Sequence, residues 1–190
     1  MSTFEFVTIL LSVVVGLGIT RLLSGLGRAI EFHRQLKVYW VQVIWSINVG
    51  LYLVLFWWAV IFGYSNMETW HFVNFISLFF YAILLYLQAA LILPSNLEPG
   101  MDLEAHFFSI RKWFFFIGVL LPIAELNDTL MHGLDNLFDL GFYYFAMQIS
   151  GIILALIAML TKNRIFHGVL CLVYLGTMVS WIFIQYRSIG

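Results

Sequence analysis

Long apolar runs separated by short polar stretches form the dominant pattern along the chain. The runs lie near Phe4–Gly27, Tyr39–Tyr64, Trp70–Leu93, His106–Leu126, Phe142–Leu160 and Ile165–Tyr186. Each is close to the length of about 20 helical residues that crosses a bilayer. The runs lack the alternation of barrel strands, and a helix satisfies every backbone group of such a run within lipid. The pattern therefore predicts an all-α integral membrane protein, a bundle of six transmembrane helices.

The amino-acid composition supports this class. Of the 190 residues, 63% are hydrophobic and 10% are charged, whereas soluble domains have roughly 45–50% apolar and about 25% charged residues. The formal net charge of −1 offers no basic surface to a nucleic acid, so the lipid bilayer is the expected partner. No linker-like or low-complexity stretch divides the chain, and we interpret residues 1–190 as a single transmembrane helical domain.

The basic residues gather in alternate connections between the apolar runs. Seven of the nine Lys and Arg residues do so, namely Arg28, Arg34, Lys37, Arg111, Lys112, Lys162 and Arg164. Such loops stay in the cytoplasm, so six spans place both termini on the non-cytoplasmic side of a cell membrane, such as a bacterial inner membrane. Met1–Phe6 contains no Lys or Arg and no cleavage site follows the first run, so we interpret that run as a mature helix rather than a signal peptide.

Two connections have patterns that predict more than a plain loop. The connection 94–109 begins with turn residues, after which Asp102 is a plausible N-cap for a short interfacial helix on the cytoplasmic side. The connection 128–140 has apolar residues on one helical face and acidic residues opposite, which predicts a short interfacial helix on the outer side. A re-entrant turn is the alternative, because Gly133 lies in the middle of this stretch.

Small residues recur every four positions in the first apolar run. They are Ser12, Gly16, Thr20 and Ser24, with Gly18 and Gly25 forming a second pair. Small side chains let another helix backbone come close. The first helix is therefore expected either at the centre of the bundle or at a seam between copies of the chain, and a pore-lining helix is the alternative.

Polar residues inside the apolar runs mark the candidate functional sites, because lipid makes such residues costly. One set belongs to the cytoplasmic half of the spans: Arg21, Gln42, Asn48 and Gln88. A second set belongs to the outer half: Asn74, Glu125, Asp128 and Gln148. Together they could line a polar pathway. The alternative is that Arg21 reaches the headgroups and that Glu125 and Asp128 are solvated there.

Several membrane chemistries find no support in the sequence. All five histidines lie at span boundaries or in loops, which argues against a haem held by two histidines. No HExxH or phosphate-binding motif is present, and Cys171 is the single cysteine. The sequence around Ser150 matches only part of the rhomboid-protease motif and has no histidine at the same depth. We therefore expect no cofactor, no metal and no catalytic residue.

Three functions remain open. The preferred one is a small channel or transporter for an ion or small solute, assembled as a homo-oligomer. The second is a non-transporting scaffold, sensor or accessory subunit that acts through a partner membrane protein. The third is a membrane enzyme acting on a lipid-like substrate, with Glu125, Asp128 and His132 as acid–base groups.

Overall fold

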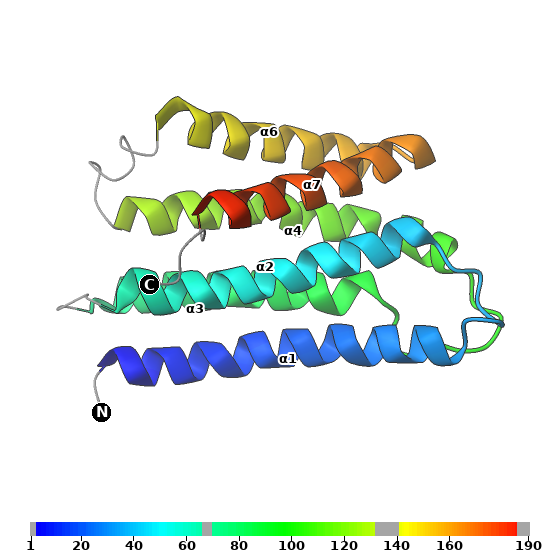
Figure 1. Ribbon diagram of the computed structural model, residues 1–190, viewed down its shortest axis with the longest axis horizontal. Helices are drawn as coiled ribbons and strands as arrows, with labels where there is room; N and C mark the ends of the chain where they lie inside the picture. The colour runs from blue at the N-terminus through cyan, green and yellow to red at the C-terminus, as the bar shows by residue number, and fades with distance from the viewer. Residues whose placement is uncertain (1–2, 66–69, 132–140, 186–190) are drawn as a thin grey trace.

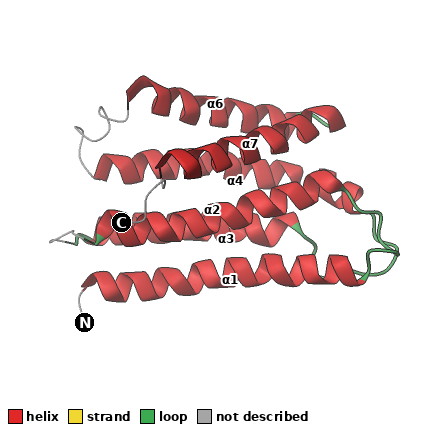
Figure 2. Cartoon of the chain, in the orientation of Figure 1, coloured by secondary structure: helices red, strands yellow, loops and turns green. Residues whose placement is uncertain are grey.

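The computed structural model describes residues 3–65, 70–131 and 141–185, and this part of the chain is helical with no strand (Figures 1 and 2). The helices are α1 (Thr3–Glu31), α2 (Trp40–Tyr64), α3 (Phe72–Ile92), α4 (Leu103–Met131), α6 (Gly141–Leu160) and α7 (Arg164–Gln185). Each predicted apolar run forms one of them. Five are long and apolar enough to cross a membrane, whereas the described apolar part of α6, Tyr144–Leu160, is shorter. The all-helical, membrane-type architecture is thus confirmed.

The helices lie side by side along one common direction (Figure 1). Helix α1 lies at one edge against α2 and α3, and α6 lies at the opposite edge against α4, while α7 packs on α2. We call the end that holds the connections 32–39, 93–102 and 161–163 the basic end, and the end where α1 begins and α7 finishes the terminal end. The connections rich in Lys and Arg therefore lie together at one end of the bundle.

Two glycines set the packing of α1. A Cβ atom added at Gly18 would lie 3.1 Å from Leu53 Cδ1 of α2, and one added at Gly25 would lie 2.7 Å from Leu93 Cδ1. Leucine side chains of the neighbouring segments thus fill the space that these glycines leave open.

The small residues that recur every four positions along α1 mostly lie on a different, exposed part of its surface. Ser12 is half-buried and accepts a hydrogen bond from Trp57 Nε1 (2.8 Å), but Gly16, Thr20 and Ser24 are exposed. Helix α1 is accordingly at the edge of the bundle rather than at its centre. The glycine pair, spaced by two helical turns, makes the close contact within the chain.

The connection before α4 ends in the predicted cap. Asp102 Oδ1 accepts a hydrogen bond from the Ala105 N–H (3.0 Å), which satisfies one of the free donors of the first turn. The separate interfacial helix predicted within 94–109 is wrong, because residues 103–109 are the first turns of α4 itself. Leu103 and Phe107 are buried in the core, so this stretch packs against protein instead of lying on the membrane surface.

The predicted outer interfacial helix, 128–140, is divided in the structure. Residues 128–131 continue α4, and residues 132–140 lie outside the described part of the chain. His132 lies there as well.

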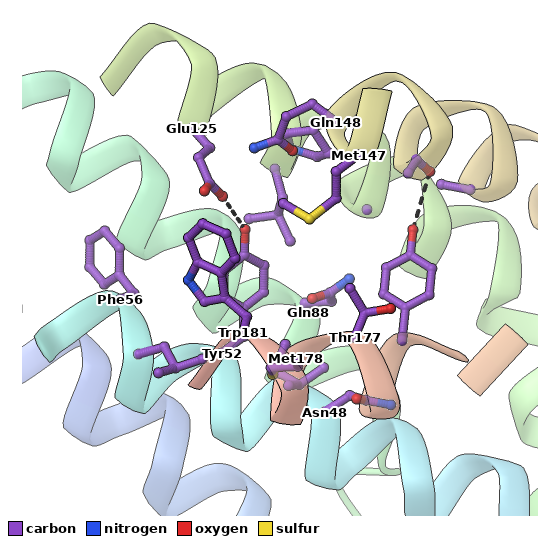
Figure 3. Close-up of a pocket in the computed structure, with 18 of the residues that line it drawn as sticks. Asn48, Tyr52, Phe56, Gln88, Glu125, Met147, Gln148, Thr177, Met178 and Trp181 are labelled. Atoms are coloured by element: carbon purple, nitrogen blue, oxygen red, sulfur yellow. Dashed lines mark hydrogen bonds between the residues drawn. The ribbon is translucent and has the colours of Figure 1, made fainter. Parts of the chain in front are cut away.

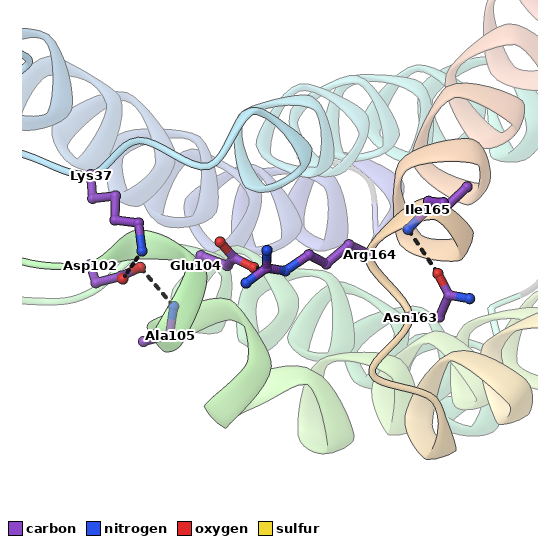
Figure 4. Close-up of polar contacts among 7 residues, drawn as sticks. All are labelled: Lys37, Asp102, Glu104, Ala105, Asn163, Arg164 and Ile165. Atoms are coloured by element: carbon purple, nitrogen blue, oxygen red, sulfur yellow. Dashed lines mark hydrogen bonds and ion pairs between the residues drawn. The ribbon is translucent and has the colours of Figure 1, made fainter.

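Polar contacts hold the basic end together (Figure 4). Lys37 Nζ lies 2.7 Å from Asp102 Oδ2, and this hydrogen-bonded ion pair raises the pKa of the Lys37 ammonium and lowers the pKa of the Asp102 carboxyl. Arg164 of α7 pairs with Glu104 of α4. Asn163 Oδ1 caps α7 by accepting the N–H of Ile165 (2.9 Å). The contacts therefore join α4 to α7 and to the segment before α2.

We predict that Gly25→Ala destabilises the protein relative to Gly16→Ala. Both changes give the same gain in helix propensity, but the new methyl group meets Leu93 at position 25 and nothing within 4 Å at position 16. The difference should be about 1–3 kcal/mol, the usual cost of overpacking. The midpoint of thermal unfolding in detergent measures it, and equal midpoints for the two variants would contradict the packing described here.

Candidate functional site

A cavity of about 340 Å³ lies between α2, α3, α4, α6 and α7 (Figure 3). Its wall is largely apolar, and in the described part of the chain α1 contributes none of it. Five of the eight polar candidates predicted from the sequence line this one space: Asn48, Gln88, Glu125, Asp128 and Gln148. Members of both predicted polar sets thus face the same cavity.

Glu125 of α4 lies at the centre of a hydrogen-bonded cluster in the cavity wall. Tyr52 of α2 donates its hydroxyl to Glu125 Oε2 (2.7 Å), and Tyr81 of α3 donates to the same oxygen (2.9 Å). The two hydroxyl oxygens are also 2.7 Å apart. The Gln148 amide of α6 faces the same carboxyl group. Four helices therefore position one acidic group.

Asp128 follows Glu125 by one helical turn and lines the same cavity nearer the terminal end. Its Oδ1 accepts a hydrogen bond from the Tyr64 hydroxyl of α2. The same arrangement, a tyrosine donating to a carboxylate, thus occurs twice between α2 and α4. Both acids are therefore half-buried and hydrogen-bonded within the protein.

The three tyrosines of these clusters were not among the residues predicted for the site. Tyr52, Tyr64 and Tyr81 stand within strongly apolar runs, where aromatic residues are ordinarily core or interface residues. Chemical reasoning could have identified them, because a buried tyrosine hydroxyl needs a polar partner and few acidic residues lie at the matching depth.

Gln88 of α3 is the second notable polar group. Its side chain is 95% removed from solvent, it points into the cavity, and its amide makes no hydrogen bond within the described chain. The residue opposite is Gly118, where an added Cβ would lie 3.6 Å from Gln88 Nε2. Pro122 has no N–H to donate to the Gly118 carbonyl, so that carbonyl lacks its usual helical partner. The Gln88 amide thus lies beside a part of α4 whose backbone lacks one helical hydrogen bond.

Asn48 attaches α7 to α2 at the edge of the cavity. Its Nδ2 donates to the carbonyl oxygen of Cys171 (3.0 Å), and its Oδ1 has no partner in the described residues. The side chain is 3% exposed. The amide is thus partly a structural contact between helices and partly an unused acceptor.

Aromatic residues close the cavity toward the basic end. The Trp45 ring lies 5.4 Å from the Phe114 ring and 5.3 Å from the Phe115 ring. The Phe115 ring stacks on His167 at 5.5 Å, and Phe107 contacts the same imidazole edge-on. All five side chains are buried, so they form a packed floor.

Arg21 and Gln42 lie outside the cavity and cap the end of α3. Gln42 Nε2 donates to the Ile92 carbonyl, and Arg21 Nη2 donates to the Leu93 carbonyl (2.9 Å). These carbonyls belong to buried residues at a helix end, where no intrahelical donor remains, and a cation there also favours the helix dipole. Helix α3 stops here because Pro94 follows.

Asn74 also lies outside the cavity wall. It is buried in the first turn of α3, near the terminal end. Of the sequence candidates, Arg21 and Gln42 thus contact the end of α3, and Asn74 lies in its first turn. The other five line the cavity.

No family model, curated protein or solved structure matches this chain. Any functional assignment therefore rests on the geometry of the site itself. Among the described residues no group of three or more His, Cys, Asp or Glu side chains is placed to hold a metal ion. The cavity instead offers a carboxyl group, amides and aromatic rings, which suit an organic ligand.

We predict that Arg21→Met lowers stability by about 1–3 kcal/mol, because the buried Leu93 carbonyl loses its donor. Arg34→Met, at an exposed position in the loop, is the matched control and should leave stability unchanged. Thermal unfolding in detergent compares the two. If Arg21→Met is as stable as its control, the cap contributes nothing to the fold.

Proposed function

We propose that the protein is a multi-pass membrane transporter that binds a small organic solute in the cavity. The observation that carries this proposal is the convergence of Gln88, Glu125 and Gln148 on one apolar space between five helices. Ligand sites are usually apolar pockets with a few convergent polar groups, and they often lie between the helices of a bundle. Transporters hold their substrates in this manner within the membrane.

A carrier fits the cavity better than an open channel does. A channel needs a continuous path lined by polar groups or water, whereas buried aromatic rings such as Trp45 and Phe115 fill the bundle toward the basic end. Transport would therefore require the floor to open after the ligand has bound. The same floor favours a second candidate, a membrane sensor that binds the solute without moving it.

The proposed setting is a cell membrane crossed six times. The connections at the basic end would face the cytoplasm and both termini the opposite side, following the distribution of Lys and Arg. Homo-oligomerisation stays a prediction. The exposed Gly16, Thr20 and Ser24 on α1 would suit a close contact with a second copy.

We predict that purified protein in liposomes takes up at least one member of a panel of labelled amines, amino acids, sugars and anions. Glu125→Gln and Gln88→Leu should lower uptake about tenfold or more, because each removes a polar group from the cavity. Glu98→Gln, the same chemical change at an exposed loop residue, is the control. Absence of uptake across the panel would favour the sensor, and normal uptake in both cavity variants would reject the site.

We predict that cysteine labelling of intact cells distinguishes the two ends. In a background with Cys171→Ala, a membrane-impermeant maleimide should label Thr3→Cys and should leave Lys37→Cys unlabelled until the cells are opened. Both positions are exposed, so reactivity reports the side of the membrane. The reverse result would invert the proposed orientation.

A further inference from the structure

We propose that the cavity binds a hydrophobic organic cation, with the charge beside Glu125 and a second, uncharged hydrogen-bonding group at Gln88. This proposal rests on the proposed function, since it names the substrate class of the same cavity. Four observations support it: the charge of the wall, its aromatic content, the unpartnered amide of Gln88, and the place where the cavity opens.

The charge of the wall has one sign. Glu125 and Asp128 are its acidic residues, and no Lys, Arg or His is among the described residues that line it. Tyr52 and Tyr81 donate their hydroxyl protons to Glu125 Oε2, the arrangement expected for a carboxylate acceptor. In a medium of low dielectric constant, an ionised carboxylate without a basic neighbour attracts a cationic ligand, and the ligand in turn stabilises the ionised form.

The wall is also rich in aromatic rings. Those of Trp45, Tyr52, Phe56, Tyr81, Phe115 and Trp181 are among them. Aromatic faces attract weakly hydrated cations such as alkylammonium and phosphonium ions, and they bury the apolar parts of the same molecules. A hydrated inorganic ion would gain little from such a surface, so the wall favours an organic cation.

Gln88 provides an independent sign of a ligand. A buried amide without a partner costs free energy unless a ligand or water completes its hydrogen bonds. Gln88 is 5% exposed and points into the cavity with no partner in the described chain. It lies seven residues from Tyr81 on α3, or about 10 Å along the helix. A ligand that reaches both Glu125 and Gln88 therefore carries two polar groups separated by an apolar part.

The cavity opens sideways between α6 and α7. Ser150 of α6 and Val173 and Thr177 of α7 line the cavity and are exposed, so we take the gap between these two helices as its opening. Exposed apolar side chains flank this opening, including Ile149 (55% exposed) and Leu172 (51% exposed). Because these residues lie within apolar helices, the opening faces the hydrocarbon. A ligand that arrives from the bilayer must itself be largely apolar.

The test is binding of tetraphenylphosphonium to the full-length protein in lipid nanodiscs. Tetraphenylborate has nearly the same shape and the opposite charge, so comparison of the two isolates the charge. We expect saturable phosphonium binding above that of empty nanodiscs, and no saturable borate binding. Absence of saturable phosphonium binding, or a preference for borate, would overturn the proposal. This comparison uses the wild-type protein and needs no variant.

Two variants then test the residues. Glu125→Gln should weaken phosphonium binding about tenfold or more, whereas the exposed control Glu98→Gln should bind as the wild type does. Gln88→Leu should weaken binding of ethidium, a cation with amino groups, more than that of phosphonium, which has none. Equal phosphonium affinity in a folded Glu125→Gln, or an equal effect of Gln88→Leu on both probes, would count against the assignment.

The outcome separates this inference from the transport proposal. Phosphonium binding that depends on Glu125, without uptake into liposomes, would support the cation site and reject transport. Uptake of an uncharged or anionic solute, without phosphonium binding, would support transport and reject the cation site.

Discussion

A hydrocarbon environment offers no hydrogen bond to a polar group, and this constraint explains most of the polar contacts in the structure. The end of α3 is the clearest case. Its last carbonyls lie inside the protein, so side chains from two other helices, Arg21 and Gln42, supply the donors. The acids of α4 follow the same rule, because Glu125 and Asp128 each accept tyrosine hydroxyls from neighbouring helices. These contacts inside the bundle therefore link one helix to another.

The architecture could be predicted from the sequence because it depends on the same constraint. Apolar runs of sufficient length must be helices, and each helix matches a predicted run to within a few residues. The Asp102 cap was predictable for a local reason, since its side chain reaches an N–H three residues away. The interfacial helix in 94–109 was wrong because its apolar residues, Phe107 among them, contact the core, and no local pattern distinguishes a lipid-facing phenylalanine from a buried one.

The candidate site was only partly predictable. Gln88, Glu125 and Gln148 could be selected from the sequence, because the cost of a polar side chain in lipid depends on its own position, and all three line the cavity. Whether these side chains converge depends on the orientation of each of the five helices about its own axis. The sequence alone does not determine that orientation. For the same reason, the sequence could not show that Arg21 caps a helix whereas Gln88 faces a cavity. Both are polar residues at similar depth, and only tertiary contacts distinguish their roles.

Helix α7 packs against α2 beside the cavity. Near the basic end, Gly168 leaves room for the Trp40 ring, at 3.0 Å from an added Cβ, and Asn48 holds the Cys171 carbonyl. Beyond Cys171 the helix continues to Gln185 for roughly four turns, or about 21 Å, and part of it lines the cavity. A tilt of this part of α7 by about 10° about its contacts near the basic end would displace the end of the helix by about 4 Å. Trp181 lies on this part of α7 and lines the cavity, so such a tilt would move an indole ring in the wall of the binding space.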